Sequence, residues 1–400
     1  MGSAKVLIYQ LYPLAWSGIR EMTAFLPRIE ALGADFVWLS PIYPSPRYDM
    51  GYDVADYYGI DYRLGTMEDF DEFVRTAHML GLKVIMDLVL NHTSTEHAWF
   101  HAHPEYYIWD KCSRPGWKNL FNQGSAWQLY APRGKYYCHL FHEKQADLNW
   151  FHLGVINRSL IEEFRTIMAF WMYVHDVDGF RLDAPQALNK KLNKDELEFK
   201  TLLKGERAAL IINMLSHISG KKTPFLMMEC FDPTFGSIVD YYTKETDVEF
   251  VTNAMLKSTA TRGALGSFRQ KLDAHAKNPR YVLELESHDS PRFTSRTGLS
   301  GFEILDNMFS TEARTVCLYQ GQELGLKNPT REELPDAELL ALDAQSAMQF
   351  AAGASLESLR ETSRANARVR LPLDEYTRQE KNPCSTLNKA KQYIETWRVS

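Results

Sequence analysis

The segment Asp178-Gly179-Phe180-Arg181-Leu182-Asp183 decides how the rest of the chain is interpreted. Its composition is typical of a buried strand, and side chains two residues apart on a strand point to the same face, so Arg181 and Asp183 should share one site. An Asp beside a fixed cation is expected to stay ionised and to be a usable nucleophile. Asp178 is expected only to mark the start of the strand. Because most Arg/Asp pairs at strand ends are structural, the segment needs support from other strand ends.

Apolar runs alternate with helical patterns along the whole chain. The runs predict strands at residues 6–12, 36–41, 83–90, 178–183, 224–228, 247–252, 281–285 and 315–319. Apolar residues at helical spacing predict helices between them, for example at 19–32, 70–80, 164–175, 208–218, 265–276 and 302–311. Eight strands alternating with helices predict an α/β fold of the closed (β/α)8 TIM-barrel type. No GxGxxG motif follows a strand, which argues against a dinucleotide-binding sheet.

One connection is much longer than the others. It lies between the third strand, ending near Asn91, and a helix beginning near Ile156, and it is rich in Trp, Tyr, His and Pro. Such a loop predicts an inserted subdomain over the barrel mouth. The expected domains are therefore 1–91 as the first part of the barrel, 92–150 as the inserted subdomain B, and 151–400 as the remainder of the barrel.

Composition limits the classes of partner. The chain is 45% hydrophobic and 24% charged with a formal net charge of −6, so it has no basic excess for nucleic acid. Its apolar runs are far shorter than the roughly 20 residues of a membrane span. Five cysteines without CxxC spacing, and a strand pattern that begins at once, favour reduced thiols and a cytoplasmic location. Nothing in the sequence indicates the oligomeric state.

Several predicted strands end in residues that carry chemistry. Asn91-His92 follow the third strand, Asp183 ends the fourth, Glu229 ends the fifth and His288-Asp289 follow the seventh. The carboxyl ends of barrel strands meet at one face, where barrel enzymes have their active sites. The sequence therefore predicts one site built from carboxylates and histidines.

These residues resemble a known family. The runs Asp87–His92 (DLVLNH) and Gly179–Asp183 (GFRLD), with Glu229 and Ser287–Asp289, resemble the four conserved regions of glycoside hydrolase family 13, the α-amylase family. The run Gln145–Asn149 (QADLN) is similar to the QPDLN motif of its oligo-1,6-glucosidase subfamily. Ser363–Arg368 (SRANAR) is similar to the SRDNAR motif of the same group, and the resemblance extends from about Val6 to about Arg398.

The resemblance implies catalytic roles. Asp183 matches the nucleophile, Glu229 the general acid/base, and Asp289 the third acid, which binds sugar hydroxyls. Retaining cleavage of a glycosidic bond needs one ionised carboxylate and one protonated carboxyl about 5 to 5.5 Å apart. The apolar run before Glu229 suits the acid, and Arg181 is expected to keep Asp183 ionised. Without the resemblance, Asp289 would also fit an ion pair with Arg292.

The resemblance also implies substrate-binding residues. His92, His288 and Arg181 match those that hold the nucleophile and the sugar in the first subsite. Asp49 and Tyr52 match the pair that binds the non-reducing end, and Asp49 is expected to form a salt bridge with Arg368. That bridge would close one end of the site and favour attack on the ends of short sugars.

The chain also departs from the subfamily. The calcium-binding loop after the first strand is replaced by the short Leu14–Gly18, so no metal or other cofactor is expected. His97, His101 and His103 fit a loop and turn better than a metal site. Relatives continue beyond the position of Ser400, so their C-terminal β-domain is expected to be missing or truncated. The run 369–374 (VRLPLD) replaces TPMQWD and leaves the far wall of the pocket open to question.

Together these features predict a retaining, exo-acting α-glucosidase that cleaves maltose-, sucrose- or isomaltose-like substrates through a glucosyl-Asp183 intermediate. Ala184 stands where α-1,6-acting relatives carry Val, which favours α-1,4 or disaccharide substrates. The alternative within the class is a glucosyltransferase or sugar isomerase of the trehalose or isomaltulose type. A non-catalytic partner protein is the alternative outside it, and the three carboxylates argue against it.

Overall fold

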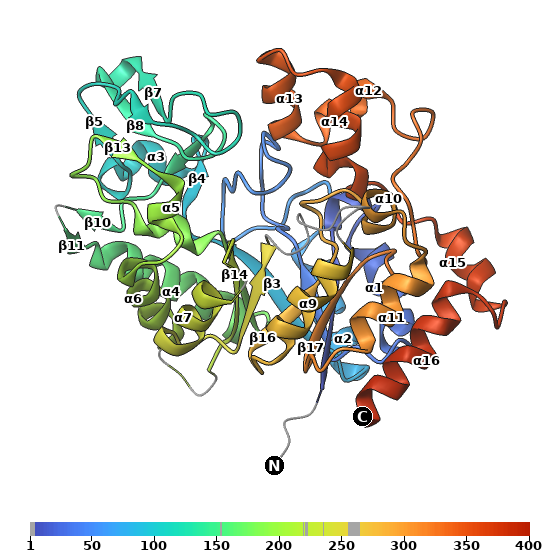
Figure 1. Cartoon of the computed structure of the whole chain (residues 1–400). Coiled ribbons are helices and arrows are strands. Elements are labelled where there is room, and N and C mark those ends of the chain that lie inside the picture. Colours follow the sequence, from blue (N-terminus) through green and yellow to red (C-terminus); the bar gives the residue numbers. More distant parts are fainter. Residues whose placement is uncertain (1–4, 153, 219, 221–222, 235, 255–264) are drawn as a thin grey trace.

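Eight parallel strands close into a barrel at the centre of the molecule (Figure 1). The computed structural model describes residues 5–152, 154–218, 220, 223–234, 236–254 and 265–400. The strands are β1 (Val6–Leu11), β2 (Phe36–Leu39), β3 (Lys83–Val89), β12 (Gly179–Asp183), β14 (Phe225–Cys230), β15 (Phe250–Asn253), β16 (Tyr281–Glu284) and β17 (Thr315–Tyr319). Each pairs with its neighbour in the order of the chain, and β1 pairs with β17 to close the ring. The predicted (β/α)8 barrel and its eight strands are confirmed.

Helices surround the barrel. The main ones are α1 (Ile19–Glu30), α2 (Met67–Met79), α4 (Arg158–Tyr173), α6 (Glu206–Ser216), α7 (Ser237–Glu245), α9 (Leu265–Ala276), α11 (Gly301–Phe309) and α16 (Thr386–Val399). Local sequence explains their ends: α2 begins at a capping box between Thr66 and Asp69, and Gly81 follows its last turn with a positive φ of 78°. Short helices lie between them: α10 (Phe293–Thr297), α15 (Leu373–Glu380), and the 3-10 turns η1 (Pro13–Ala15) and η4 (Pro185–Asn189).

The strands are buried on both faces, which is why they appear in the sequence as continuous apolar runs. One set of side chains fills the barrel interior: Ile8, Phe36, Trp38, Ile85, Met227, Val282 and Cys317. The alternating set packs against the helices in a much larger core. Polar side chains such as Arg181 and Glu229 break this pattern only near the carboxyl end, where the site lies.

Small sheets follow β3 and stand over one side of the barrel (Figure 1). They are β4 (His92–Ser94) with β9 (Gln145–Asp147), β5 (Trp109–Asp110) with β8 (Lys135–Cys138) and β7 (Trp127–Tyr130), β10 (Phe151–His152) with β11 (Val155–Ile156), and β6 (Gly116–Trp117) with β13 (Glu196–Leu197). Residues after β12 also contribute, through β13, α5 (Phe199–Leu202) and the small core around Trp117. The range 92–150 for an inserted subdomain therefore stays an interpretation. His97, His101 and His103 surround the short helices α3 (Ala98–Ala102) and η2 (Pro104–Tyr106).

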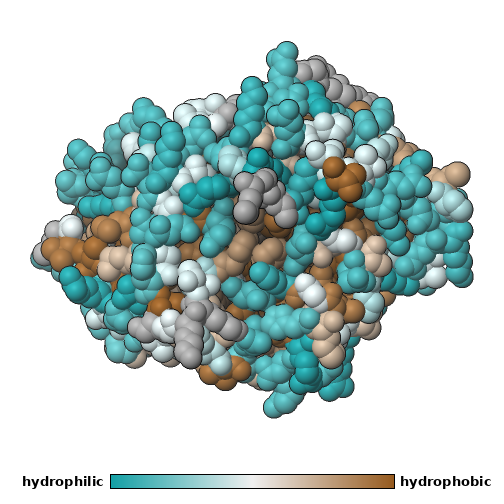
Figure 2. All heavy atoms as spheres, turned by 90° about the horizontal axis from the view of Figure 1, so that it is seen from below, coloured by the Kyte–Doolittle hydropathy of each residue, from teal (hydrophilic) through white to brown (hydrophobic). Residues whose placement is uncertain are grey.

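A second segment reaches over the mouth between β17 and α15. It contains α12 (Asp336–Ala341), α13 (Ala344–Ala351), α14 (Leu356–Thr362) and the 3-10 turn η5 (Arg364–Ala367), and it faces the small sheets across the barrel opening (Figure 1). The molecule seen from below is mostly hydrophilic, with hydrophobic residues visible between hydrophilic ones (Figure 2). No helix in the described part of the chain has the length and apolar character needed to cross a lipid bilayer.

Candidate active site

A cavity of about 470 Å³ lies where the barrel strands end, between the small sheets and the α12–α14 segment. Six of the residues predicted from the sequence line it: Asp49, Tyr52, His92, Asp183, Glu229 and Asp289. The other three, Arg181, His288 and Arg368, lie behind this lining and contact residues in it. The structure thus brings all nine predicted residues to one place, although their chemical roles stay predictions.

Arg181 is the centre of the acidic side of the cavity. Its Nη1 lies 2.6 Å from Oδ1 of Asp183 and 2.8 Å from Oδ1 of Asp87, and its Nη2 lies 2.9 Å from Oε2 of Glu229. The register explains the arrangement, since Arg181 on β12 is directly opposite Asp87 on β3. One guanidinium therefore binds both the candidate nucleophile and the candidate acid, and only 2% of Arg181 is exposed.

The charges around this guanidinium act on Asp183 in opposite directions. Burial raises the pKa of Asp183 well above its usual range, the attraction of Arg181 lowers it, and repulsion from Glu229 and Asp87 adds to the effect of burial. Burial likewise raises the pKa of Asp87 to about 6. Arg181 lowers the pKa of Asp183, in the expected direction, but burial and the neighbouring carboxylates act against it. That Arg181 keeps Asp183 ionised therefore stays a prediction.

Ala184 contributes a contact that sequence reasoning missed. Its backbone has φ 38° and ψ 44°, a left-handed conformation that is costly for a residue with a Cβ. In this conformation its N–H donates to Oε2 of Glu229 at 3.1 Å. The strained turn after Asp183 therefore holds Glu229 beside the nucleophile.

Aromatic rings form another wall. The His288 ring lies between Tyr52, at 5.2 Å and 5°, and Tyr12, at 5.7 Å and 10°. The Tyr52 hydroxyl donates to Oδ2 of Asp87 at 3.0 Å and lies 2.5 Å from Nε2 of His288. The side-chain amide nitrogen of Gln10 lies 2.8 Å from Nδ1 of His288, on the other side of the imidazole ring. This ring stack fixes the position of Tyr52 in the wall of the cavity.

His92 lies on the same side, at the end of β3. Burial lowers its pKa to about 4, so its imidazole is neutral near pH 7. Its Nε2 lies 3.2 Å from the backbone oxygen of Tyr52 and 3.0 Å from the side-chain amide nitrogen of Gln145. A neutral His92 supplies hydrogen bonds and shape to the cavity.

The salt bridge at the closed end differs from the expected one. Asp49 pairs with Arg364, whose Nη2 lies 3.1 Å from Oδ1, and not with Arg368. Arg364 begins η5 and Arg368 is its C-cap four residues later, and because a 3-10 turn has three residues per turn, they point in different directions. Both belong to the SRANAR run, so the sequence identified the segment but named the wrong arginine as the partner of Asp49.

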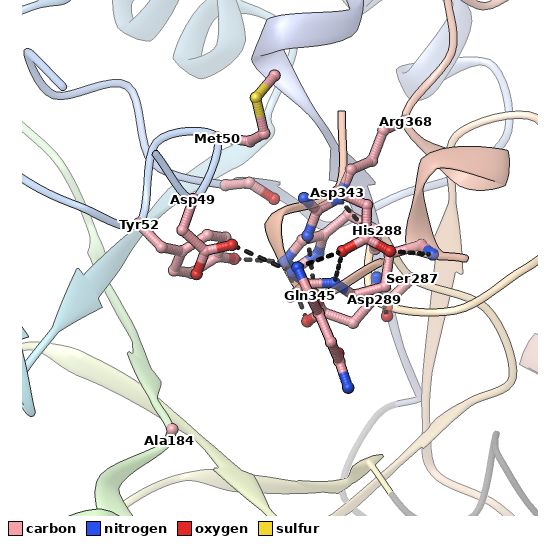
Figure 3. Close-up of polar contacts among 12 residues, drawn as sticks. Asp49, Met50, Tyr52, Ala184, Ser287, His288, Asp289, Asp343, Gln345 and Arg368 are labelled. Carbon is pink, nitrogen blue, oxygen red and sulfur yellow. Dashed lines mark hydrogen bonds and ion pairs between the residues drawn. The ribbon is translucent and has the colours of Figure 1, made fainter. Parts of the chain in front are cut away.

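Asp289 is bound by several cationic or polar groups. Its Oδ1 lies 3.2 Å from Nη2 of Arg368 and 3.4 Å from Nη1 of Arg364, and its Oδ2 lies 3.1 Å from Nε2 of His288. Figure 3 shows Asp49 and Tyr52 facing His288 and Asp289, with polar contacts between the residues drawn. The alternative ion pair with Arg292 is wrong, since Arg292 contacts Glu286 and the Gln320 carbonyl instead.

Further lining residues come from segments without a catalytic motif. They are Leu120, Phe121, Gln123 and Phe141 near the small sheets, Phe199 and Phe231 after β12 and β14, Ala254, Ser290, and Gln345 on α13. The Trp and Tyr residues noticed in the insertion mainly pack with one another, and phenylalanines line the cavity in their place. No sequence signal separates these phenylalanines from core residues.

Two negative observations delimit the site. A larger cavity, of about 1200 Å³, lies between the small sheets and the starts of α4 and α6, and none of the strand-end carboxylates lines it. Within the residues that the structure describes, no group of three or more His, Cys, Asp or Glu could hold a metal ion. Metal independence remains a prediction.

Comparisons with known proteins agree with this geometry. The family model for the alpha amylase catalytic domain matches residues 15–379. The trehalose-6-phosphate hydrolase of Bacillus subtilis (strain 168) is 32% identical over an alignment of 372 positions that covers 81% of this chain and 65% of that protein. The oligo-1,6-glucosidase of Parageobacillus thermoglucosidasius is 29% identical over an alignment of 439 positions that covers 93% of this chain and 75% of that protein. This chain thus spans from about two thirds to three quarters of the length of these relatives.

Solved structures show the same fold. The trehalose-6-phosphate hydrolase of Bacillus licheniformis superposes with a TM-score of 0.83 at 27% identity, covering 99% of this chain and 84% of that one. The isomaltulose synthase of Protaminobacter rubrum gives a TM-score of 0.85 at 24% identity, covering 99% and 83%, a likeness that shows the fold alone. The family match over most of the sequence is decisive, and the chain belongs to the alpha-amylase family.

Proposed function

We propose that this protein is a retaining α-glucosidase that removes glucose from the non-reducing ends of short α-glucosides. One observation carries the proposal: Arg181 holds Asp183 and Glu229 side by side in a cavity whose far end is closed by the Asp49–Arg364 salt bridge. Paired carboxyl groups that serve as nucleophile and acid are the requirement for retaining hydrolysis.

The residues have the following roles in the proposed reaction. The Asp183 carboxylate attacks the anomeric carbon while Glu229 gives its proton to the departing glycosidic oxygen, so the bond to the leaving sugar breaks as the glucosyl-Asp183 ester forms. Glu229 then takes a proton from water, and the resulting hydroxide equivalent attacks the anomeric carbon and releases Asp183. Asp289 accepts hydrogen bonds from sugar hydroxyls.

The closed end explains why short substrates are proposed. Asp49 and Arg364 both line the cavity, and their salt bridge occupies the space through which a longer chain would pass beyond the bound glucose. A polysaccharide can therefore enter only with its end. The carboxylate and guanidinium groups at this end also suit sugar hydroxyls, which donate to carboxylates and accept from guanidinium groups.

Charge favours neutral over phosphorylated sugars. Among the described lining residues, Asp49, Asp183, Glu229 and Asp289 are acidic, and Arg364 is the one cationic residue, itself paired with Asp49 and Asp289. A phosphate group entering this lining would meet more negative than positive charge. We therefore propose maltose-, sucrose- or isomaltose-like substrates for this chain, although some relatives are named trehalose-6-phosphate hydrolases.

Glucosyl transfer or isomerisation is the second candidate function. The aromatic side chains Phe121, Phe141, Phe199 and Phe231 line the cavity. An apolar lining can hold a released sugar against its ring faces and keep water away from the ester, so that a sugar hydroxyl attacks in place of water. A purely non-catalytic role would not need the three converging carboxylates.

The test is turnover of p-nitrophenyl α-glucoside, maltose, isomaltose, sucrose and trehalose by the protein and by Asp183→Asn. The proposal expects kcat/KM on at least one substrate to fall by about 10³-fold or more in the variant, because the nucleophile is lost. Proton NMR should show the α-anomer of glucose formed first. Equal rates for the protein and the variant on every substrate would refute catalysis, and product analysis at high sugar concentration separates hydrolysis from transfer.

A further inference from the structure

The start of α13 holds both arginines of the SRANAR run from outside the barrel. Asp343, the N-cap of α13, places Oδ1 2.9 Å from Nε of Arg364, and the neighbouring backbone oxygen of Leu342 accepts from Nη1 of Arg368 at 3.0 Å. Arg364 and Arg368 in turn contact Asp49 and Asp289. The segment therefore lies one contact behind the closed end of the cavity.

The Asp343 carboxylate is saturated by donors. Its Oδ2 accepts from Ser346 Oγ at 2.6 Å, Ser363 Oγ at 2.9 Å and the Arg364 N–H at 3.0 Å, while Oδ1 also accepts from the Gln345 N–H at 3.1 Å. Only 1% of Asp343 is exposed. Burial alone would raise its pKa, but the guanidinium groups of Arg364 and Arg368 hold the pKa of Asp343 well below its usual range. The group is a fixed anion at every working pH.

This anion determines which atoms of Arg364 remain for the cavity. With Nε bound to Asp343, the guanidinium plane is set, and its two terminal nitrogens reach Asp49 at 3.1 Å and Asp289 at 3.4 Å. The family motif SRDNAR carries an Asp directly after its first Arg, whereas this chain has Ala365 there. The carboxylate beside Arg364 comes instead from Asp343, a residue twenty-one positions earlier in the chain.

We propose that Asp343 is the positioning residue of the closed end: through Arg364 it orients Asp49 and Asp289 for the glucosyl group. Figure 3 draws Asp343 and Gln345 in one view with His288, Asp289 and Asp49. The proposal rests on the proposed function, since it assigns Asp343 to glucose binding at that same site. A misplaced binding group weakens catalysis by about 10- to 100-fold even when it makes no contact with the reacting atoms.

The test is a double-mutant cycle between Asp343→Asn and Arg364→Ala, with KM and kcat measured separately on the best substrate of the protein. Asp343→Asn should raise KM about tenfold and change kcat by less than about threefold, because it disturbs binding at the end remote from the reacting bond. If Asp343 acts through Arg364, the double variant should have a KM within about twofold of Arg364→Ala alone. Multiplying effects would overturn the proposal.

The matched control is Asp336→Asn on α12, in the same segment. Asp336 also binds arginines, with Arg360 Nη1 at 2.6 Å, but it does not line the cavity. The KM of Asp336→Asn should equal that of the unmodified protein. An equal rise of KM in Asp336→Asn and Asp343→Asn would point to a general loss of structure and overturn the proposal. If Asp343→Asn does not fold, Ser346→Ala, which removes one donor to Oδ2, replaces it in the cycle. Ser346→Ala should raise KM about twofold by itself and leave it unchanged within about 1.2-fold in the Arg364→Ala background, and a twofold rise in both backgrounds is the refuting result.

The two proposals fail in different ways. Absence of turnover by the unmodified protein would refute the glucosidase and leave no KM to compare. Turnover that is unchanged in Asp343→Asn would refute only the positioning role.

Discussion

Lys190 forms a buried ion pair that connects the small sheets to the barrel, and its replacement by Met should destabilise the protein strongly. Its Nζ lies 2.7 Å from Oδ2 of Asp147, with side-chain exposures of 4% and 0%, and it also donates to Oδ1 of Asn91. In the variant, Oδ1 of Asp147 would still accept hydrogen bonds from the Asn91 amide at 2.9 Å and the Leu140 N–H at 3.2 Å. Its Oδ2 would retain only the contact with the Cys138 thiol at 3.6 Å. Lys190→Met thus leaves a buried carboxylate without its cation.

The magnitude follows from that loss. Removing one partner of a buried pair costs about 3 to 5 kcal/mol, because the remaining charge stays desolvated. With an unfolding entropy of about 2.1 cal/mol/K per residue, this corresponds to a decrease in Tm of about 4 to 6 °C for a chain of this length. Differential scanning calorimetry measures it, and because Asn91 precedes His92 in the site, kcat/KM should fall as well.

Two control variants separate the pair from the residue. Lys190→Met with Asp147→Asn removes both charges and should recover at least half of the lost stability, since the unpaired anion is gone. Lys191→Met replaces the adjacent, exposed lysine and should leave Tm within about 1 °C. A decrease of less than about 1 °C for Lys190→Met, or a double variant no more stable than the single one, would refute the assignment of a buried ion pair.

Three further predictions concern activity. Burial raises the pKa of Asp87 to about 6 and also raises the pKa of Asp183 above its usual range, so these carboxylates lose their negative charge as the pH falls. We therefore expect kcat/KM to drop about tenfold per pH unit below about pH 6. A flat profile down to pH 4 would contradict this. Phe121→Ala should raise KM about three- to tenfold, since Phe121 lines the cavity and lies 5.2 Å from the Arg364 guanidinium carbon, and an unchanged KM would count against its contact with substrate. Dialysis against EDTA should leave kcat and Tm unchanged, and calcium-restored activity would show that a metal site exists.

The barrel was predictable from sequence because closure buries its strands on both faces. Runs such as Val84–Leu90, interrupted only by Asp87, and Val316–Tyr319 are apolar because the strands are buried on both faces. The helical segments between the runs leave few possible topologies. Their ends then meet at one face, so the separate motifs around His92, Asp183 and Glu229 had to converge.

Two features of the site have a common cause. The pairing of Asp49 with Arg364 and not Arg368 depends on how η5 turns, and the contacts of Asp87, Asp183 and Glu229 with one guanidinium depend on how three strands bring them together. Both are properties of distances between atoms on different elements, and distance sets the energy of a charge pair. A motif names residue types and leaves those distances open.

The amino-acid sequence by itself therefore determined the architecture and the identity of the strand-end carboxylates, because periodicity and residue type can be recognised in short stretches of the sequence. Tertiary structure alone decided which arginine closes the cavity, that phenylalanines and not the conspicuous tryptophans line it, and that Asp343 stands behind Arg364. These outcomes come from loops that pack over the mouth, where each contact is made by residues far apart in the chain and no periodic pattern records which side chain faces which.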